Sequence, residues 1–433
     1  MESIGHILLG ISNVLGFLLL LTFVYQLVLT LFGFRKNSRD YAEHAPRSRF
    51  LILVPAHNEE QVIGDIVDNL QRMDYPKELY DFYIIADNCT DRTADVVRAR
   101  GGNVLEFQKE SPDAPTGKPI ALKRALDQLG DYAKKYDLLM IFDADNLMDT
   151  NMFREVNSQY LDQGKPDFIQ CYLGCKNKTG LVAWYDYVSF TISNRFTQLA
   201  KHRLGLNCGI GGTGYAMSTS YLKERGGWTT MSLTEDLEIQ VEAVLQGRRI
   251  LWNHNTRVYD EKPTRFLASL RQKIRWGQGH WFVFFHNLIP SIRSVVQGKI
   301  SFWEFLSIFH CMASPCIYIF GILQLLIAGI LLIPAFGIPA HPIFAMDFIT
   351  TLWTLVVFLY SCIILFYVAD RMDNQVAFHI STLPLMVGNL VINAIISVIS
   401  QVVGLFRFRQ QQHWVKTEHT MTAASMHSGV HAT

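Results

Sequence analysis

The stretch LLMIFDADNLMD, residues 138–149, joins an apolar β-strand to a group of carboxylates. Five of its first six residues are apolar, and Asp143, Asp145 and Asp149 follow directly. Strand-like and helix-like patterns alternate on both sides of it, between residues 49 and 280. This alternation predicts a mostly parallel sheet covered by helices, in which ligands bind beyond the carboxyl ends of the strands. We therefore expect the acidic end of this strand to face a ligand.

Two other polar clusters follow predicted strands in the same way. AHNEE (residues 56–60) comes after an apolar run, and DNCTD (residues 87–91) comes after the next one. Asp and Asn also favour turns and helix caps, so any single cluster can be purely structural. Three clusters at one sheet edge favour a ligand site. Within it, the D-x-D pair can hold Mg²⁺ or Mn²⁺ and leave coordination positions for diphosphate oxygens, although D-x-D alone is common by chance.

The glycine-rich segment GIGGTG, residues 209–214, matches the dinucleotide-binding fingerprint. That fingerprint should open the helix after the first strand, whereas this segment comes late and is followed by YAMSTS. We interpret it as a chance match, and as a wall that lets a substrate approach the backbone closely. No Walker A sequence is present, because TGKP at residues 116–119 lacks the required spacing.

The composition favours a protein that is partly membrane-embedded and partly soluble. Of the 433 residues, 49% are hydrophobic and only 18% are charged. The net charge of +1 provides no overall basic field, so a nucleic acid is not an expected partner. The seven cysteines are scattered without a C-x-x-C pair, which favours reduced thiols over a disulfide framework or a zinc site.

The N-terminal segment predicts a transmembrane helix. No charged residue lies between Glu2 and Arg35, and a bilayer crossing needs about 20 apolar residues. A signal peptide, the alternative, would have a basic start and a shorter apolar run. Here the basic residues Arg35 and Lys36 follow the run, which places the next domain in the cytosol.

The C-terminal third predicts further membrane segments. Apolar runs indicate crossings near residues 313–334, 347–369 and 384–406, and the aromatic segment 282–312 is typical of interfacial helices. Four crossings in all would place the basic residues near 407–416 outside, against the positive-inside tendency. A re-entrant last segment, or two crossings within 305–346, would each resolve the conflict, and both alternatives stay open.

Two more motifs carry candidate functional residues. SLTEDLEIQVEAVLQG has helical spacing, with Ser232 and Glu235 placed as a capping box. Its acidic residues Glu235 and Asp236 have a structural alternative, because they complement a helix dipole. QKIRW, residues 272–276, adjoins the predicted interfacial region, where Arg275 and Trp276 also suit simple membrane anchoring.

Taken in order, these motifs resemble a known family signature. The signature is D, D-x-D, T-E-D and Q-x-x-R-W, and the chain has Asp87, Asp143-x-Asp145, Thr234-Glu235-Asp236 and Gln272-x-x-Arg275-Trp276. It is typical of processive glycosyltransferase family two, the group of cellulose, chitin, hyaluronan and poly-N-acetylglucosamine synthases. The resemblance covers roughly residues 49–280, and VPAHNEE also resembles the opening strand and loop of the family.

The resemblance implies an α/β GT-A (Rossmann-like) cytosolic domain combined with transmembrane and interfacial helices. It implies inverting transfer from a UDP-sugar, UDP-glucose or UDP-N-acetylglucosamine, with Mg²⁺ or Mn²⁺ as cofactor. By the family pattern, Ala56, Glu59 and Asp87 contact the uridine, and Lys118 lies near the nucleotide. The donor diphosphate would be held through a metal ion on Asp143 and Asp145, with Asp145 as the direct ligand.

The same resemblance assigns the acceptor side. Asp236 would be the general base, and Arg275 would contact the nucleotide diphosphate. The acceptor would be bound by Gly212, Thr213, Gly214, Glu235, Gln272 and Trp276. Apart from the resemblance, these residue types suit the chemistry of sugar transfer. A positioned carboxylate that takes the hydroxyl proton is typically worth about 10²- to 10⁴-fold in rate. A planar guanidinium suits a diphosphate, and an indole can stack on a sugar ring.

We therefore expect five segments: a transmembrane helix (1–36), a catalytic domain (49–262), interfacial helices carrying Q-x-x-R-W (263–312), transmembrane helices (313–406) and a polar tail (407–433). The leading hypothesis is a plasma-membrane, multi-pass synthase that elongates a β-linked polysaccharide and secretes it. The alternatives are a transferase that adds one sugar to a lipid, and a non-catalytic channel or scaffold.

His57 replaces an aromatic residue that is frequent in the family. No cyclic-di-GMP module is visible, so that regulation would need an accessory subunit.

Overall fold

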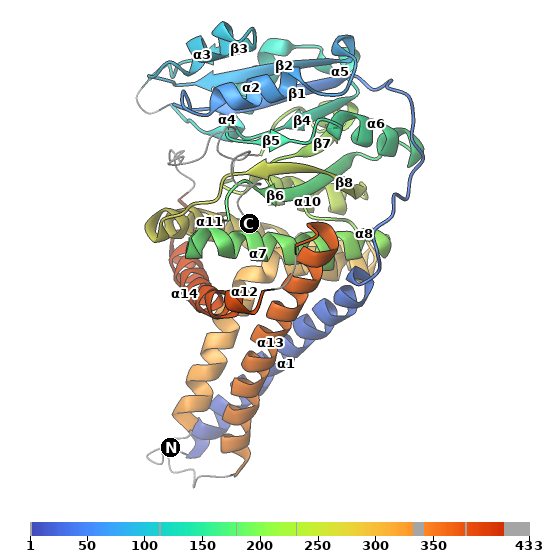
Figure 1. Cartoon of the computed structure of the whole chain (residues 1–433). Coiled ribbons are helices and arrows are strands. Elements are labelled where there is room, and N and C mark those ends of the chain that lie inside the picture. The colour runs from blue at the N-terminus through green and yellow to red at the C-terminus, as the bar shows by residue number, and fades with distance from the viewer. Residues whose placement is uncertain are drawn as a thin grey trace.

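The computed structural model describes residues 2–111, 114–178, 180–230, 232–331, 342–376 and 379–410. A long N-terminal helix, α1 (Glu2–Gly33), precedes a domain built on one eight-stranded sheet with the order β3-β2-β1-β4-β7-β6-β8-β5. Figure 1 shows this sheet domain at one end of the molecule, with α1, α12 and α13 extending away from it. The strands are β1 (Phe50–Ala56), β2 (Tyr80–Asp87), β3 (Asn103–Phe107), β4 (Leu138–Ile141), β5 (Leu147–Met148), β6 (Phe168–Cys175), β7 (Tyr215–Ser218) and β8 (Ile250–Asp260).

The sheet is parallel in its first half and mixed in its second. Strands β3, β2, β1 and β4 are parallel, as the strand–helix alternation predicts. Strand β7 then pairs antiparallel with both β4 and β6, and β5 pairs antiparallel with β8. The prediction of a mostly parallel sheet is therefore wrong for the second half. The glycine-rich segment leads directly into β7 rather than into a helix, which is incompatible with a dinucleotide fingerprint.

Strand β1 explains why the sheet is covered on both faces. All seven of its residues are buried, as expected for a central parallel strand with helices on either side. Successive side chains point to opposite faces. Leu51 and Leu53 belong to a core cluster that includes Leu122 of α4, whereas Ile52 and Val54 pack in another cluster with α2.

The helices of the sheet domain are mostly short. They are α2 (Ile63–Gln71), α3 (Thr93–Ala99), α4 (Lys118–Leu129), α5 (Tyr132–Lys135), α6 (Met152–Asp162), α7 (Leu181–Ser193), α8 (Ala200–Arg203), α9 (Thr219–Glu224) and α10 (Glu235–Leu245), with short helices η1 (Lys77–Leu79) and η2 (Asn194–Leu199). The predicted capping box at Ser232 is wrong. Thr234 is the N-cap of α10 and makes no side-chain cap bond, while the Ser232 N–H donates to the Glu238 carboxylate at 3.3 Å.

Four long helical elements follow the domain: α11 (Phe266–Val296), α12 (Phe302–Leu331), α13 (Pro342–Asp373) and α14 (Leu383–Arg407), the last preceded by η4 (Ile380–Thr382). Helix α12 runs without a break across the expected boundary between interfacial and transmembrane segments at residues 312 and 313. Within the described ranges, two segments are long and apolar enough to cross a bilayer, Gly5–Gly33 and Ile380–Arg407. The expected spans near 313–334 and 347–369 fall on α12 and α13 as far as they are described, and the described residues there contain no further segment of this kind. Residues 332–341 and most of the predicted polar tail, from 411 onward, lie outside the described residues.

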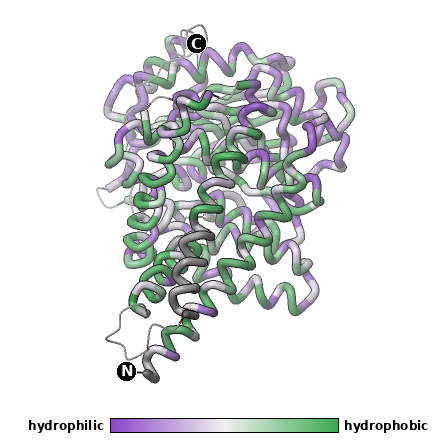
Figure 2. Tube along the Cα trace, turned by 60° about the horizontal axis from the view of Figure 1, so that its bottom comes forward, coloured by the Kyte–Doolittle hydropathy of each residue, from purple (hydrophilic) through white to green (hydrophobic). Residues whose placement is uncertain are grey.

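The long helices fall into two groups. Helix α1 packs along α12, where Leu15 meets Ile327, and α13 lies beside α12. Helix α14 instead packs on α11 and α7, close to the sheet domain, and does not reach the far end of the other three helices in Figure 1. Figure 2 shows hydrophobic residues along the helices near the N-terminus, while hydrophilic residues are frequent over the sheet domain.

Candidate active site

The D-x-D segment begins two residues after strand β4 ends. The Asp143 N–H donates to Asn146 Oδ1 at 3.0 Å and to Thr213 Oγ1 at 3.2 Å. Thr213 also donates from its hydroxyl to Asn146. The second aspartate, Asp145, accepts from the Glu261 N–H at 3.2 Å. These bonds tie the acidic loop to the glycine-rich segment on one side and to the end of β8 on the other.

Lys118, the first residue of α4, joins three of the predicted motifs. Its ammonium lies 2.7 Å from Asp143 Oδ1, 2.7 Å from the Gly212 carbonyl oxygen and 3.7 Å from Glu235 Oε1. Burial acts to lower the pKa of Lys118, but the Asp143 and Glu235 carboxylates outweigh it and raise the pKa. The structure thus brings the D-x-D loop, the glycine-rich segment and the T-E-D motif together at one lysine.

Asp236 lies in the first turn of α10, facing the glycine-rich segment. The Leu237 N–H donates to Asp236 Oδ1 at 2.9 Å. A methyl group added at Gly212 would lie 3.1 Å from Asp236 Oδ2, and Gly212 has a φ of +75°, which favours glycine. Burial raises the pKa of Asp236, and burial also raises the pKa of Glu235 to about 7 against the effect of Lys118. Both carboxyl groups therefore bind protons more readily than exposed ones.

Helix α11 brings Q-x-x-R-W to the same region. A methyl group added at Gly279 would lie only 2.4 Å from Thr234 Oγ1, so α11 touches the residue that begins the T-E-D motif. The Trp276 ring lies 5.1 Å from the Lys273 ammonium. Gln272 Oε1 is buried without a hydrogen-bond partner in the described part of the chain. Arg275 is half-buried, and no contact joins it to the D-x-D loop among the described residues.

The predicted uridine-binding residues lie at the ends of β1 and β2. Ala56 and Ala86 are partners in the parallel register of these strands, so Asp87 follows directly at the same edge. Asp87 is buried, and its carboxylate is 3.7 Å from Arg124 of α4. Neither oxygen has a hydrogen-bond partner among the residues described, and burial raises the pKa of Asp87. Glu59 is buried nearby, with its N–H donating to Thr93 Oγ1 at 2.8 Å.

Two residues at the site were not predicted from the sequence. Asn146 holds the D-x-D loop, and its place in the DADN stretch was the available signal. His280 lies one helical turn after Trp276, whose carbonyl oxygen is 2.8 Å from its Nδ1. A carbonyl accepts, so Nδ1 carries the hydrogen. Burial lowers the pKa of His280, and the nearby Asp236 charge opposes this shift. The Q-x-x-R-W motif ends before this position, and the residue gives no other signal.

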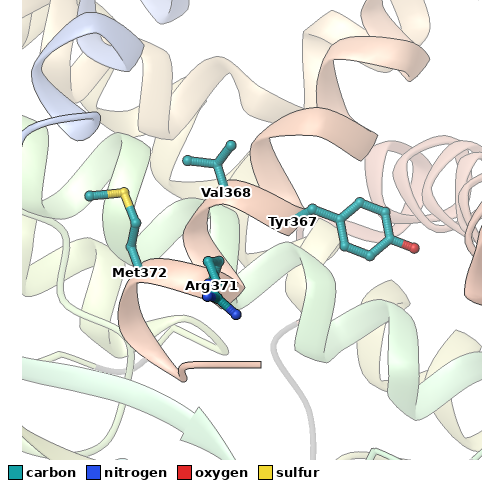
Figure 3. Close-up of a pocket in the computed structure, with 4 residues that line it drawn as sticks. All are labelled: Tyr367, Val368, Arg371 and Met372. Atoms are coloured by element: carbon teal, nitrogen blue, oxygen red, sulfur yellow. The ribbon is translucent and has the colours of Figure 1, made fainter. Parts of the chain in front are cut away.

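A separate hollow lies away from these residues. It measures about 450 Å³ and is lined by Tyr367, Val368, Arg371 and Met372. Figure 3 shows that all four side chains come from α13, the helix drawn in pale orange. None of them is a predicted site residue, so this hollow is distinct from the D-x-D and T-E-D cluster.

The fold and the clustered motifs define a GT-A glycosyltransferase. A family described as glycosyltransferase like family 2 matches residues 46–279, more than half of the chain. The chain therefore belongs to glycosyltransferase family 2, a family of inverting enzymes. A mannosyltransferase from Pyrobaculum calidifontis, solved with GDP-mannose and Mn²⁺, matches with a TM-score of 0.59 at 16% identity. That match covers 91% of this chain and 99% of the other, and it shows the shared fold.

Sequence relatives differ in their acceptors. A probable glycosyltransferase, YdaM of Bacillus subtilis, is 23% identical over 74% of this chain and 76% of its own length. A β-monoglucosyldiacylglycerol synthase of Synechocystis is 28% identical over 55% of this chain, and the match spans 49% of that relative. The poly-β-1,6-N-acetyl-D-glucosamine synthase of Staphylococcus epidermidis is 21% identical over 60% of this chain and 61% of that relative.

Proposed function

We propose that this chain transfers a sugar from a UDP-sugar to an acceptor hydroxyl, with Asp236 as the general base. The observation that carries the proposal is the convergence at Lys118 of Asp143, Gly212 and Glu235, with Asp236 adjoining Gly212. Four segments distant in sequence meet there, and each contributes a group that the transfer needs.

Asp236 has the surroundings of a base. The Leu237 N–H holds Oδ1, while Oδ2 faces the side-chain-free Gly212. Burial raises its pKa, which makes the carboxylate a better proton acceptor than an exposed one. The acceptor oxygen forms a bond to the anomeric carbon as the bond from that carbon to the diphosphate breaks. The hydroxyl proton passes to Asp236, the nucleoside diphosphate leaves, and the configuration inverts.

Asp143 and Asp145 fit Mg²⁺ or Mn²⁺, because hard carboxylate oxygens suit these ions. Within the described residues, no group of three His, Cys, Asp or Glu side chains could hold a metal. The pair therefore fits an open site that diphosphate oxygens complete. When bound, the ion neutralises charge on the leaving diphosphate. The Mn²⁺ and GDP-mannose in the P. calidifontis structure support this assignment.

The nucleotide would lie over β1 and β2. The Asp87 carboxylate is buried and lacks hydrogen-bond partners in the described chain, so it can accept hydrogen bonds from the nucleoside. Ala56 ends β1 at the same edge of the sheet, and Glu59 lies in the loop that follows it. Arg275 is the candidate for a planar contact with the diphosphate.

For the acceptor we propose a growing β-linked polysaccharide. Below Trp276, helix α14 carries a buried polar stripe of Asn389, Asn393, Ser397 and Ser400. The side-chain oxygens of Asn389, Asn393 and Gln272 are buried without hydrogen-bond partners among the described residues. Sugar hydroxyls would supply donors to these oxygens, and this supports a path for a glycan between α7, α11 and α14.

A lipid acceptor is the second candidate, because the Synechocystis relative is named as a β-monoglucosyldiacylglycerol synthase. One experiment separates the two. Detergent-purified protein is incubated with radiolabelled UDP-glucose, UDP-N-acetylglucosamine or GDP-mannose and Mg²⁺ or Mn²⁺. A large, glycanase-sensitive product supports the polysaccharide, and a small product that enters organic solvent supports the lipid. No transfer from any UDP-sugar would overturn the proposal.

We further propose a plasma-membrane protein whose catalytic domain is cytosolic. Helices α1, α12 and α13 would cross the bilayer, while α14 lies along α11 near the domain, as its packing on α11 and α7 suggests. Three crossings leave Arg407 and Arg409 on the cytosolic side, which agrees with the positive-inside tendency. A C-terminal tag that is protected from protease in sealed, right-side-out cells supports this topology. A tag cleaved there contradicts it.

A further inference from the structure

Lys176, the residue after strand β6, is tied to the D-x-D loop through one peptide group. Its N–H donates to the Asp260 carbonyl oxygen at 2.8 Å. The N–H of the next residue, Glu261, donates to Asp145 Oδ2 at 3.2 Å. The peptide between Asp260 and Glu261 therefore has the Lys176 backbone at one end and the predicted metal ligand Asp145 at the other.

The Lys176 ammonium is buried and unpartnered. The residue is only 7% exposed, and its Nζ has no hydrogen-bond partner among the described residues. Burial lowers the pKa of the Lys176 ammonium, and the Asp145 and Asp65 carboxylates oppose this shift. A buried ammonium with three unused donors costs free energy unless another molecule supplies acceptors. The peptide group that links the Lys176 backbone to Asp145 suggests that this molecule belongs to the reaction.

The ammonium groups of Lys118 and Lys176 differ in their hydrogen-bond partners. The Lys118 ammonium already has Asp143 and the Gly212 carbonyl within 2.7 Å, so its donors are largely satisfied by the protein. Lys176 also carries an ammonium group, and its backbone is linked to Asp145, the second aspartate of D-x-D. Its three donors have no partner among the described residues. Phosphoryl oxygens are strong acceptors for an ammonium, and a charge-assisted bond of this kind is short and strong.

We propose that Lys176 is a binding residue for the diphosphate of the donor, on the Asp145 side of the site. This inference rests on the proposed function, because it requires a nucleoside diphosphate bound at the D-x-D loop. Lys176 would add positive charge where the leaving group gains negative charge, and it would complete its own hydrogen bonds in the same step. The free protein would hold a costly charge that ligand binding relieves.

The test compares the full-length protein with its Lys176→Met variant. Affinities for UDP, GDP and inorganic pyrophosphate, each with Mn²⁺, are measured by titration calorimetry in detergent. We expect UDP and pyrophosphate to bind about 10- to 100-fold more weakly to the variant, the loss typical of one charge-assisted hydrogen bond. Lys178→Met is the matched control. Lys178 is exposed, two residues away and bonded to the Tyr187 hydroxyl at 3.2 Å, so nucleotide affinity should not change.

Thermal unfolding without nucleotide separates ligand binding from a structural role. Removing an unpaired buried charge should leave the melting temperature unchanged or raise it, whereas removing a structural contact should lower it. Unchanged affinities, a lowered melting temperature, or a loss seen with UDP but not with pyrophosphate would each overturn the inference. Failure of the unmodified protein to bind either UDP or GDP would instead overturn the proposed donor class, and this inference with it.

Discussion

The carboxyl edge of the sheet and the contact between α11 and α14 differ in whether their polar side chains have hydrogen-bond partners. At the sheet edge, the half-buried Lys118 contacts Asp143 and the Gly212 carbonyl. On α14, which packs on α11 and α7, the side-chain oxygens of Asn389 and Asn393 are buried without hydrogen-bond partners in the described residues. The groups around Lys118 are paired by the protein itself, whereas the oxygens on α14 have hydrogen-bonding capacity for another molecule.

This difference separates two kinds of substitution. Changes to Lys118 or Asp143 should reduce turnover or stability, because these groups have protein partners that lose a bond. Changes between α11 and α14 should alter the product more than the stability of the free protein. The predictions below test this distinction, beginning with the largest expected effect.

Replacing the candidate base should have the largest effect. Asp236→Asn keeps the shape and the Leu237 N–H contact but removes the carboxylate that takes the proton. We expect turnover to fall by about 10²- to 10⁴-fold with little change in UDP affinity. Glu238→Gln, in the same first turn, is the control and should retain most activity. Turnover in Asp236→Asn equal to that of the unmodified protein would exclude Asp236 as the general base.

The pH dependence of stability tests how strongly the sheet edge is organised. Burial raises the pKa of Glu235 from 4.5 to about 7. The group therefore contributes fully to stability at acidic pH, where it is protonated in both states, and this contribution is lost as the pH rises toward 7. Glu235→Gln should remove the loss, so its free energy of unfolding should exceed that of the unmodified protein above neutrality by up to about 3 kcal/mol. Denaturant titrations at about pH 5 and about pH 8 measure the difference. A variant that is relatively less stable at the higher pH contradicts the expectation.

The contact between α10 and α11 gives a smaller effect. Gly279→Ala places a methyl group 2.4 Å from Thr234 Oγ1, which should cost about 1–3 kcal/mol of stability and shift Trp276 away from the base. Gly321→Ala in α12 is the control, because its methyl group would meet nothing within 4 Å. That change should raise stability by up to about 1 kcal/mol through helix propensity. Equal melting temperatures for the two variants would argue that α11 is not held tightly against T-E-D.

The sequence predicts the first half of the fold well, for a physical reason. Strands β1 and β4 are continuous apolar runs, and the pairs β1–β2 and β2–β3 form through local strand–helix–strand connections. Strand β7 is different, because its antiparallel place between β4 and β6 depends on partners distant in sequence. The two-residue strand β5 is too short to carry a period.

The candidate site also has residues that the sequence predicts and residues that it does not. Asp87, the D-x-D pair, T-E-D and Q-x-x-R-W have a recognisable order, so their clustering was predictable, although their roles remain predictions. Lys176 was missed because a lysine just after an apolar strand normally indicates a solvated turn. Only the long-range pairing of β6 with β8 joins its backbone to the peptide group that contacts Asp145. Local sequence therefore identifies the groups that the protein pairs, and less readily those that await a ligand.

The smallest effect is expected between α11 and α14. Asn393→Leu removes one intrahelical bond, from Nδ2 to the Asn389 carbonyl at 3.0 Å, and also removes an unpartnered buried oxygen. These contributions oppose each other, so stability should change by less than about 1 kcal/mol. If a glycan passes along the polar stripe, the variant should make shorter chains at a nearly unchanged initial rate, measured by product size and by early sugar incorporation. Val391→Leu, on the exposed face of α14, should leave both unchanged. Chains of normal length from Asn393→Leu would mean that the stripe does not contact the product, and that the contrast between the two regions is structural.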